Sequence, residues 1–291
     1  MYLEHFGLSR APFTITPNTE SFFEEGQRGE ILSGLQYAVM ESEGITKVVG
    51  EVGAGKTMLC RMLPTTLTKE PIDWVYLAHP SMTPINMLTM IARELGMDED
   101  LIDDKPCLMH EIHACLLERY AQGRRVVVLV EEAQSISLES LEEIRYLSNL
   151  ESEEHKLIHI VLFGQPELDR NLSKQEIRQL NDRIVHQFYL DAFTPELVYR
   201  YLNFRLRCCD YKGPDLFSKK VAKRICTYAN GLIRRTNIIA EKCLLAAFSQ
   251  GRHEITEKDA KYAAQDCQLR SPRFGGLLSK LKLSHAPTRY H

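Results

Sequence analysis

ITKVVGEVGAGKT, residues 45–57, joins an apolar, β-branched run to a glycine-rich loop that ends in lysine and threonine. The loop, residues 50–57, matches the pattern G-x-x-x-x-G-K-[ST], which follows a strand and opens a helix. Its glycines let the chain curl so that successive backbone N–H groups point at phosphate oxygens. The N-terminus of the following helix adds partial positive charge. The stretch therefore predicts a phosphate-binding loop between a strand and a helix.

Two side chains of this loop carry the predicted chemistry. Lys56 is expected to reach the β- and γ-phosphates of a nucleotide, and the Thr57 hydroxyl is expected to bind Mg²⁺. A glycine loop followed by a lysine can arise by chance, but here every fixed position of the pattern is filled. The residues assigned to ATP binding are Gly50, Glu51, Val52, Gly53, Ala54, Gly55, Lys56 and Thr57.

Five apolar runs, the motif strand among them, alternate with helical patterns. The predicted strands are residues 45–50, 72–78, 125–131, 157–163 and 185–190, and the predicted helices are residues 57–68, 83–95, 105–120 and 138–150. This alternation predicts an α/β fold with a doubly wound parallel sheet. The third and fourth runs are almost continuously apolar, as is typical of central strands that are covered on both faces.

After residue 190 the pattern becomes helical. Thr194, Pro195 and Glu196 are typical of a helix start, and further helices are predicted near residues 215–229, 232–249 and 256–266. We expect an N-terminal segment plus nucleotide-binding domain at residues 1–192, an all-helical domain at 193–268 and a basic tail at 269–291. The tail is either disordered or docks on a partner or on anionic lipid. Its basic residues are Arg270, Arg273, Lys280, Lys282 and Arg289, and its leucines are Leu277, Leu278, Leu281 and Leu283.

Acidic residues end the third predicted strand. Glu131 is placed to hold Mg²⁺ together with Thr57, and Glu132 is placed to activate the attacking water as general base. The alternative is an acidic cluster that only begins a helix. Gln165 follows the fourth predicted strand, where it either contacts the γ-phosphate and the water or serves as a turn residue before Pro166.

Three arginines are further candidates. Arg178 and Arg183 precede the last predicted strand, where they either face the nucleotide of a neighbouring subunit or are simply solvated. Arg234, with Arg235 in reserve, opens a helix of the helical domain and is expected to close onto the γ-phosphate.

Composition excludes several classes of protein. The chain has 291 residues with 36 Lys+Arg against 39 Asp+Glu, a formal net charge of −3, so bulk charge does not favour nucleic-acid binding. No apolar run approaches the roughly 18 residues of a membrane span. The first residues lack the pattern of a signal peptide, which predicts a cytosolic location.

Several motifs together resemble the AAA+ ATPases of the ExeA/GspA secretion type. They are GEVGAGKT, VVLVEEAQ, FGQPEL, RQLNDRI and GLIRR, with Phe6-Gly7-Leu8, Pro12-Phe13 and Thr16-Pro17 near the start. The resemblance covers about residues 1–268 and is strongest to the ATPases of MSHA-type pilus biogenesis. That subgroup lacks the membrane helix and peptidoglycan-binding domain of the ExeA/GspA proteins.

The resemblance implies an AAA+ fold with a helical lid and assigns roles to the candidates. It implies a sensor-1 role for Gln165, a trans arginine finger at Arg183 or Arg178, and a sensor-2 role for Arg234. The sequence departs from the family where Glu131 replaces an aspartate, Ile233 a proline and Arg28 a histidine.

We therefore expect an ATPase that uses Mg-ATP, assembles into a homo-oligomeric ring or arc, and remodels partners in pilus assembly or secretion. Membrane proteins of the inner membrane would recruit it, with peripheral membrane contact through the tail and no nucleic-acid partner. Two alternatives remain at this point: an ATP-dependent DNA-binding regulator of the transposition type, and a switch in which ATP drives assembly without hydrolysis.

Overall fold

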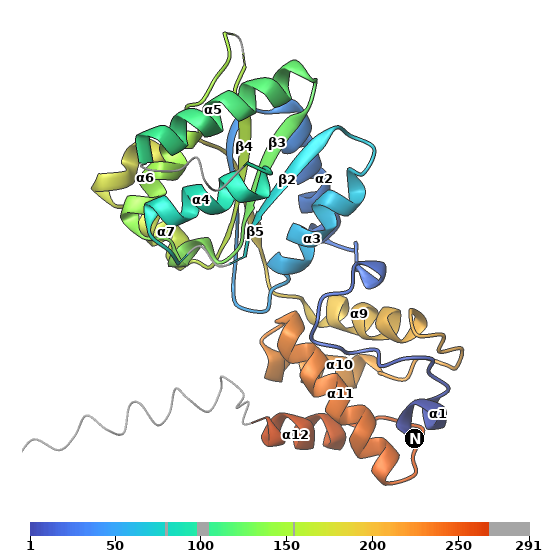
Figure 1. The fold of residues 1–291 in the computed structure, drawn as a ribbon. Coiled ribbons are helices and arrows are strands. Elements are labelled where there is room, and N and C mark those ends of the chain that lie inside the picture. The colour runs from blue at the N-terminus through green and yellow to red at the C-terminus, as the bar shows by residue number, and fades with distance from the viewer. Residues whose placement is uncertain (79–80, 98–104, 154, 268–291) are drawn as a thin grey trace, which may run out of the picture. The chain divides into compact units, whose positions relative to one another are not determined.

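A computed structural model describes residues 1–78, 81–97, 105–153 and 155–267. The chain forms two compact units: a sheet unit, Pro17–Asp191, and a helical unit that joins Met1–Thr16 to the residues from Ala192 onward. Figure 1 labels the helices and strands of both units. The basic residues and leucines predicted for the tail lie outside the described residues, so the tail stays a prediction.

The sheet unit is built on five parallel strands in the order β2-β3-β4-β1-β5. They are β1 (Gly44–Gly50), β2 (Ile72–Leu77), β3 (Arg125–Val130), β4 (Ile158–Gly164) and β5 (Ile184–Leu190). The ends of every strand lie within one residue of the prediction. All of β4 is buried, as expected of a central strand. The predicted α/β fold with a parallel sheet is confirmed.

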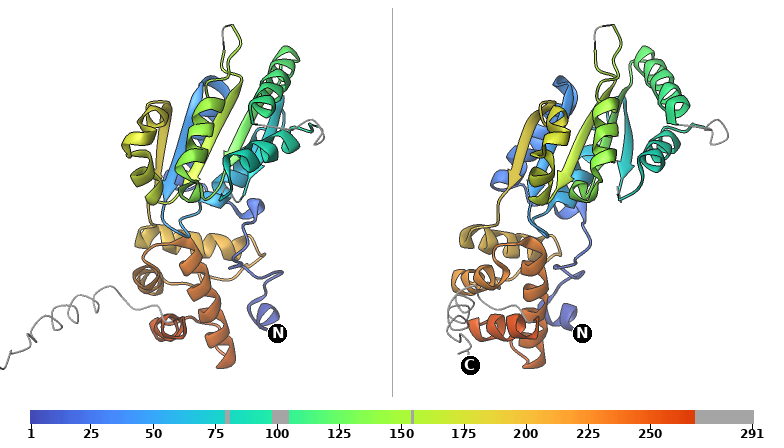
Figure 2. Two further views of the ribbon diagram at one scale, coloured as in Figure 1. Left: turned by 60° about the vertical axis from the view of Figure 1, so that its left-hand side comes forward. Right: turned by 90° about the vertical axis from the view of Figure 1, so that its left-hand side faces the viewer.

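Helices cover both faces of this sheet (Figures 1 and 2). On one face, α4 (Pro84–Glu94), α5 (Lys105–Ala121) and α6 (Leu138–Leu147) share an apolar core with alternate residues of β2, β3 and β4. On the other face lie α2 (Gln27–Glu41) and α3 (Lys56–Thr66). Two short helices, α7 (Glu167–Leu172) and α8 (Arg178–Asn181), connect β4 to β5. Because all strands run in the same direction, the loops after β1, β3 and β4 meet at one edge, the carboxyl edge.

The helical unit contains the four helices predicted after residue 190. They are α9 (Pro195–Arg207), α10 (Lys219–Ala229), α11 (Ile233–Ser249) and α12 (Glu257–Asp266). Helix α10 begins four residues later than predicted because the side chain of Ser218 caps it, accepting from the backbone N–H of Val221. None of the helices in the described part of the chain is long and apolar enough to cross a membrane.

The first sixteen residues belong to the helical unit and not, as expected, to the unit of the sheet. They begin with α1 (Tyr2–Phe6), whose Tyr2 hydroxyl donates to Glu241 Oε1 at 2.6 Å. The buried Phe13 ring meets the Phe217 ring edge-on at 5.6 Å. These apolar and polar contacts explain the difference from the expected boundary at residues 1–192, since the segment buries aromatic rings among the helices of the helical unit.

A buried histidine makes the stability of the sheet unit sensitive to pH. His159 on β4 is 3% exposed, and its Nε2 lies 3.1 Å from the Thr46 hydroxyl of β1. Burial lowers the pKa of His159 from 6.5 to about 4. Between these values the unfolded chain takes up a proton that the folded chain does not, so the free energy of unfolding falls as the pH falls.

We expect this histidine to account for a loss of about 3 kcal/mol between pH 7 and pH 4. Urea unfolding of the wild type and of His159→Gln across that range measures it, since glutamine does not titrate. The pH dependence of the variant should be weaker, whereas His253→Gln, at an exposed position, should behave like the wild type. Equal pH dependence of the wild type and His159→Gln would mean that His159 titrates normally.

Candidate nucleotide site

The glycine-rich loop after β1 has the conformation that its sequence predicts. Gly55 is the N-cap of α3 with φ +110°, and Gly53 has φ +80°, both in the region that side chains disfavour. At Gly50 an added Cβ would lie 2.9 Å from Leu190 Cβ, so only glycine fits between β1 and the end of β5. The loop therefore curls tightly onto the start of α3, the arrangement that binds phosphate.

Lys56 points back into this loop. Its ammonium donates to the carbonyl of Gly50 at 2.6 Å and to that of Glu51 at 3.1 Å, and the residue is 7% exposed. Burial lowers the pKa of Lys56, and the carboxylates of Glu132, Glu51 and Glu131 oppose that shift. The cation is thus held inside the loop and close to the two acids that follow β3.

Thr57 and Glu131 come together as predicted. The Thr57 hydroxyl donates to Glu131 Oε2 at 2.6 Å, joining the first turn of α3 to the end of β3. Glu131 is buried, and the hydroxyl of Tyr76 on β2 donates to its other oxygen, Oε1. A hydroxyl beside a carboxylate is a set of hard oxygen ligands, which fits Mg²⁺.

Glu132 and Gln165 also lie together at the carboxyl edge. The side-chain amide of Gln165 donates to Glu132 Oε2 at 3.1 Å, and that of Gln134 donates to the same oxygen at 2.7 Å. The backbone N–H of Gln165 in turn donates to Gln134 Oε1 at 3.0 Å. Glu132 is exposed, and its backbone has φ +51°, a strained conformation for any residue other than glycine. The two amides hold an exposed carboxylate next to the loop that carries Lys56.

Arg183 lies at the opposite edge of the sheet, the amino edge. Its carbonyl accepts from the N–H of Ile45 at the start of β1, and the six residue steps of β5 separate it from the carboxyl edge. At 3.3 Å per residue that separation is about 20 Å, too far for the side chain to reach the loop of its own subunit. Arg178 begins α8 and is exposed. Neither guanidinium forms a hydrogen bond or ion pair within the described ranges.

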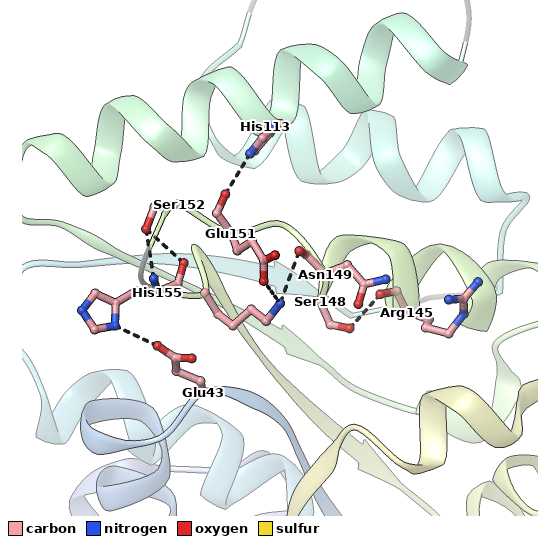
Figure 3. Close-up of polar contacts among 9 residues, drawn as sticks. Glu43, His113, Arg145, Ser148, Asn149, Glu151, Ser152 and His155 are labelled. Carbon is pink, nitrogen blue, oxygen red and sulfur yellow. Dashed lines mark hydrogen bonds and ion pairs between the residues drawn. The ribbon is translucent and has the colours of Figure 1, made fainter.

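Residues between α6 and β4 form a group of polar contacts at this edge (Figure 3). Lys156 binds Glu151 and donates to the carbonyl of Asn149 at 3.4 Å, and His155 lies 3.0 Å from Glu43. The pKa of Glu151 is lowered, chiefly by Lys156 and in smaller part by Arg183. Arg183 is therefore near a hydrogen-bonded surface segment, on a side of the sheet unit that its own nucleotide loop does not use.

Two residues of the site, Arg28 and Tyr76, are not predicted from the sequence. Arg28, at the start of α2, is 4% exposed and donates to the carbonyl of Ala54 in the phosphate loop at 2.7 Å. The sequence resemblance gives Arg28 only as a departure from a histidine. Tyr76 carried one available signal, because it is a polar-tipped residue near the carboxyl end of a strand beside β3. The predicted Arg234 and Arg235 are exposed in the first turn of α11 in the helical unit, and their roles stay predictions.

Comparison with known proteins agrees with this geometry. The family described as an AAA domain matches residues 39–172. The chain is 36% identical to general secretion pathway protein A of Aeromonas hydrophila over 266 residues, which is 91% of this chain and 48% of that protein. It is 28% identical to the ATP-dependent target DNA activator B of Escherichia phage Mu over 158 residues, 54% of this chain and 46% of that protein. The chain thus spans about half the length of these relatives.

Among solved structures, the ORC2 protein of Aeropyrum pernix matches with a TM-score of 0.66 and 17% identity, over 89% of this chain and 72% of that one. At this identity the match concerns the fold alone, and the fold is the one that the strand order and the glycine loop describe. The matched AAA domain, the similarity to general secretion pathway protein A and this fold show that the chain belongs to the AAA+ ATPases of the ExeA/GspA type.

Proposed function

We propose that the chain binds and hydrolyses ATP with Mg²⁺ at the carboxyl edge of its sheet. The observation that supports this most is the meeting of three loops there: Lys56 and Thr57 from the first, Glu131 and Glu132 from the second, and Gln165 from the third. Bound Mg²⁺ would neutralise charge between the β- and γ-phosphates, with Thr57 and Glu131 as the residues that hold it.

The remaining residues divide the reaction between them. Lys56 would exchange its loop carbonyls for phosphate oxygens. Glu132 would take the proton of the attacking water, and Gln165 would keep that water and the Glu132 carboxylate aligned. Arg183, which is too far from its own loop, would stabilise transition-state charge in a neighbouring subunit, with Arg178 as the second candidate. This division requires a homo-oligomer in which the amino edge of one sheet faces the carboxyl edge of the next.

Replacing Lys56 tests the site itself. Lys56→Ala should weaken ATP binding about 10- to 100-fold, because charge-assisted hydrogen bonds to the phosphates are lost. Calorimetry measures this affinity, and Lys69→Ala, an exposed lysine shortly after α3, is the control that should bind normally. If Lys56→Ala bound ATP as tightly as the wild type, the phosphate site would lie elsewhere.

The partners are proposed from the relatives. The name of general secretion pathway protein A indicates a role in secretion. On the basis of the sequence resemblance, we propose that this chain acts in type IV, MSHA-like pilus biogenesis. In this role ATP turnover remodels or releases an assembly protein at the inner membrane. Recruitment through the tail is part of the proposal, although its residues lie outside the described ones.

A second candidate function is ATP-dependent DNA binding. It is favoured by the charge of residues 192–267, which contain 14 Lys+Arg against 8 Asp+Glu. Seven exposed cations there form no ion pair among the residues that the structure describes: Lys212, Lys220, Lys223, Arg234, Arg235, Lys258 and Lys261. Fluorescence anisotropy with duplex DNA at 50 and 200 mM salt tests it. A steep loss of affinity with salt would favour this function, and absence of binding at low salt would exclude it.

A further inference from the structure

We propose that Tyr76 is a positioning residue that holds the Glu131 carboxylate against Thr57. This inference rests on the proposed use of Thr57 and Glu131 to hold Mg²⁺.

The arrangement of three elements carries the inference. Strand β2 pairs with β3, and the backbone N–H of Glu131 extends this pairing by donating to the carbonyl of Leu77 at 2.9 Å. Tyr76 therefore lies beside the end of β3. Its hydroxyl donates to Glu131 Oε1, while the Thr57 hydroxyl of α3 donates to Oε2 at 2.6 Å. Each carboxylate oxygen is thus held by a hydroxyl from a different element.

Such double anchoring matters more for glutamate than for aspartate. The additional methylene adds one freely rotating bond and about 1.5 Å of reach. The hydrogen bond from Tyr76 to Oε1 restricts rotation about this bond and directs Oε2 at the Thr57 hydroxyl. An aspartate at position 131 would be too short to contact both hydroxyls, so the residues around the site are adapted to glutamate.

The surroundings keep this contact intact. Glu131 is 7% exposed, and the buried Cys60 thiol, one turn after Thr57 on α3, lies against the same carboxylate. Burial raises the pKa of Tyr76, and the hydrogen bond to Glu131 raises it further.

The test compares binding of the non-hydrolysable analogue AMP-PNP with Mg²⁺ and with EDTA, by calorimetry. Tyr76→Phe should reduce the gain in affinity that Mg²⁺ provides by about 10-fold, as is typical when a partner of a metal ligand is removed. Affinity in EDTA should not change. The control is Tyr189→Phe, since Tyr189 also lies on an edge strand and is 47% exposed. Among the described residues its hydroxyl bonds only Gln187, at 3.4 Å.

A second pair of variants shows whether Tyr76 acts through Glu131. Glu131→Asp should itself reduce the Mg²⁺-dependent gain, and adding Tyr76→Phe to it should change that gain less than about twofold. A Tyr76→Phe protein that is less stable but keeps the full gain would overturn the proposal, because the role would then be structural. An equal loss in both backgrounds would overturn it as well. If the wild type bound no AMP-PNP at all, the proposed function itself would fail.

Discussion

Glu132→Gln should slow ATP hydrolysis by about 10²- to 10⁴-fold while leaving ATP binding unchanged. A positioned general base contributes on this order to turnover, and glutamine cannot accept the proton of water. The structure indicates why binding and folding should survive. The amides of Gln134 and Gln165 donate to one oxygen of Glu132, and the carbonyl of a glutamine can accept the same bonds. Phosphate release and nucleotide affinity, measured on the same preparation, separate the two effects.

Glu167→Gln is the matched control for this variant. Glu167 follows β4 at the same edge, is exposed, and forms an ion pair with Arg170 at 3.6 Å; of the four carboxylates that raise the pKa of Lys56, it has the smallest effect. Its replacement should leave turnover within about twofold of the wild type, because a surface ion pair contributes little. If Glu132→Gln hydrolysed ATP normally, the base would have to be another residue, with Glu131 the first to examine.

Arg183→Ala should bind ATP like the wild type and hydrolyse it about 10³-fold more slowly, the usual contribution of an arginine supplied in trans. The reason is geometric. Arg183 lies just before β5, about 20 Å along the strand from the phosphate loop, and its guanidinium forms no hydrogen bond or ion pair in the part of the chain that the structure describes. If Arg183 takes part in hydrolysis, it therefore acts on a nucleotide held by another subunit.

Mixing variants tests that conclusion without relying on one substitution. Lys56→Ala lacks its own nucleotide but keeps Arg183, so mixing it with Arg183→Ala should restore part of the activity across shared interfaces. The control is Arg170→Ala, because Arg170 is an exposed arginine on α7. This variant should hydrolyse ATP normally without mixing. Absence of activity at every ratio, with mixed assembly shown by light scattering, would exclude a trans role for Arg183.

The fold could be predicted because the apolar runs and the phosphate-loop motif both indicate a parallel sheet with helices. The run Val126–Val130 is apolar without interruption. Such a run is typical of a central parallel strand, which is covered on both faces, or of a buried helix. The short length of the run and the acids that follow it favoured the strand. Thr57, Glu131, Glu132 and Gln165 could be grouped because the carboxyl ends of parallel strands share one edge. Their contacts in the structure are those that this grouping implies.

Other features depend on tertiary contacts that no local pattern announces. Phe6, Leu8 and Phe13 are apolar and could be buried in either unit. Only the structure shows that they are buried in the helical unit. Arg28 reads as a surface cation at a helix start, yet it is buried against the carbonyl of Ala54. Arg183 precedes β5 in the sequence, but only the parallel strand order shows that this position is at the amino edge, away from the phosphate loop of the same subunit.

The rate of phosphate release by the wild-type chain at saturating Mg-ATP tests the central claim most directly. The account predicts release that depends on Mg²⁺, saturates with ATP, and is far faster than that of Glu132→Gln. A wild type that binds ATP but releases phosphate no faster than Glu132→Gln would contradict it, and ATP would then act only as a switch for assembly.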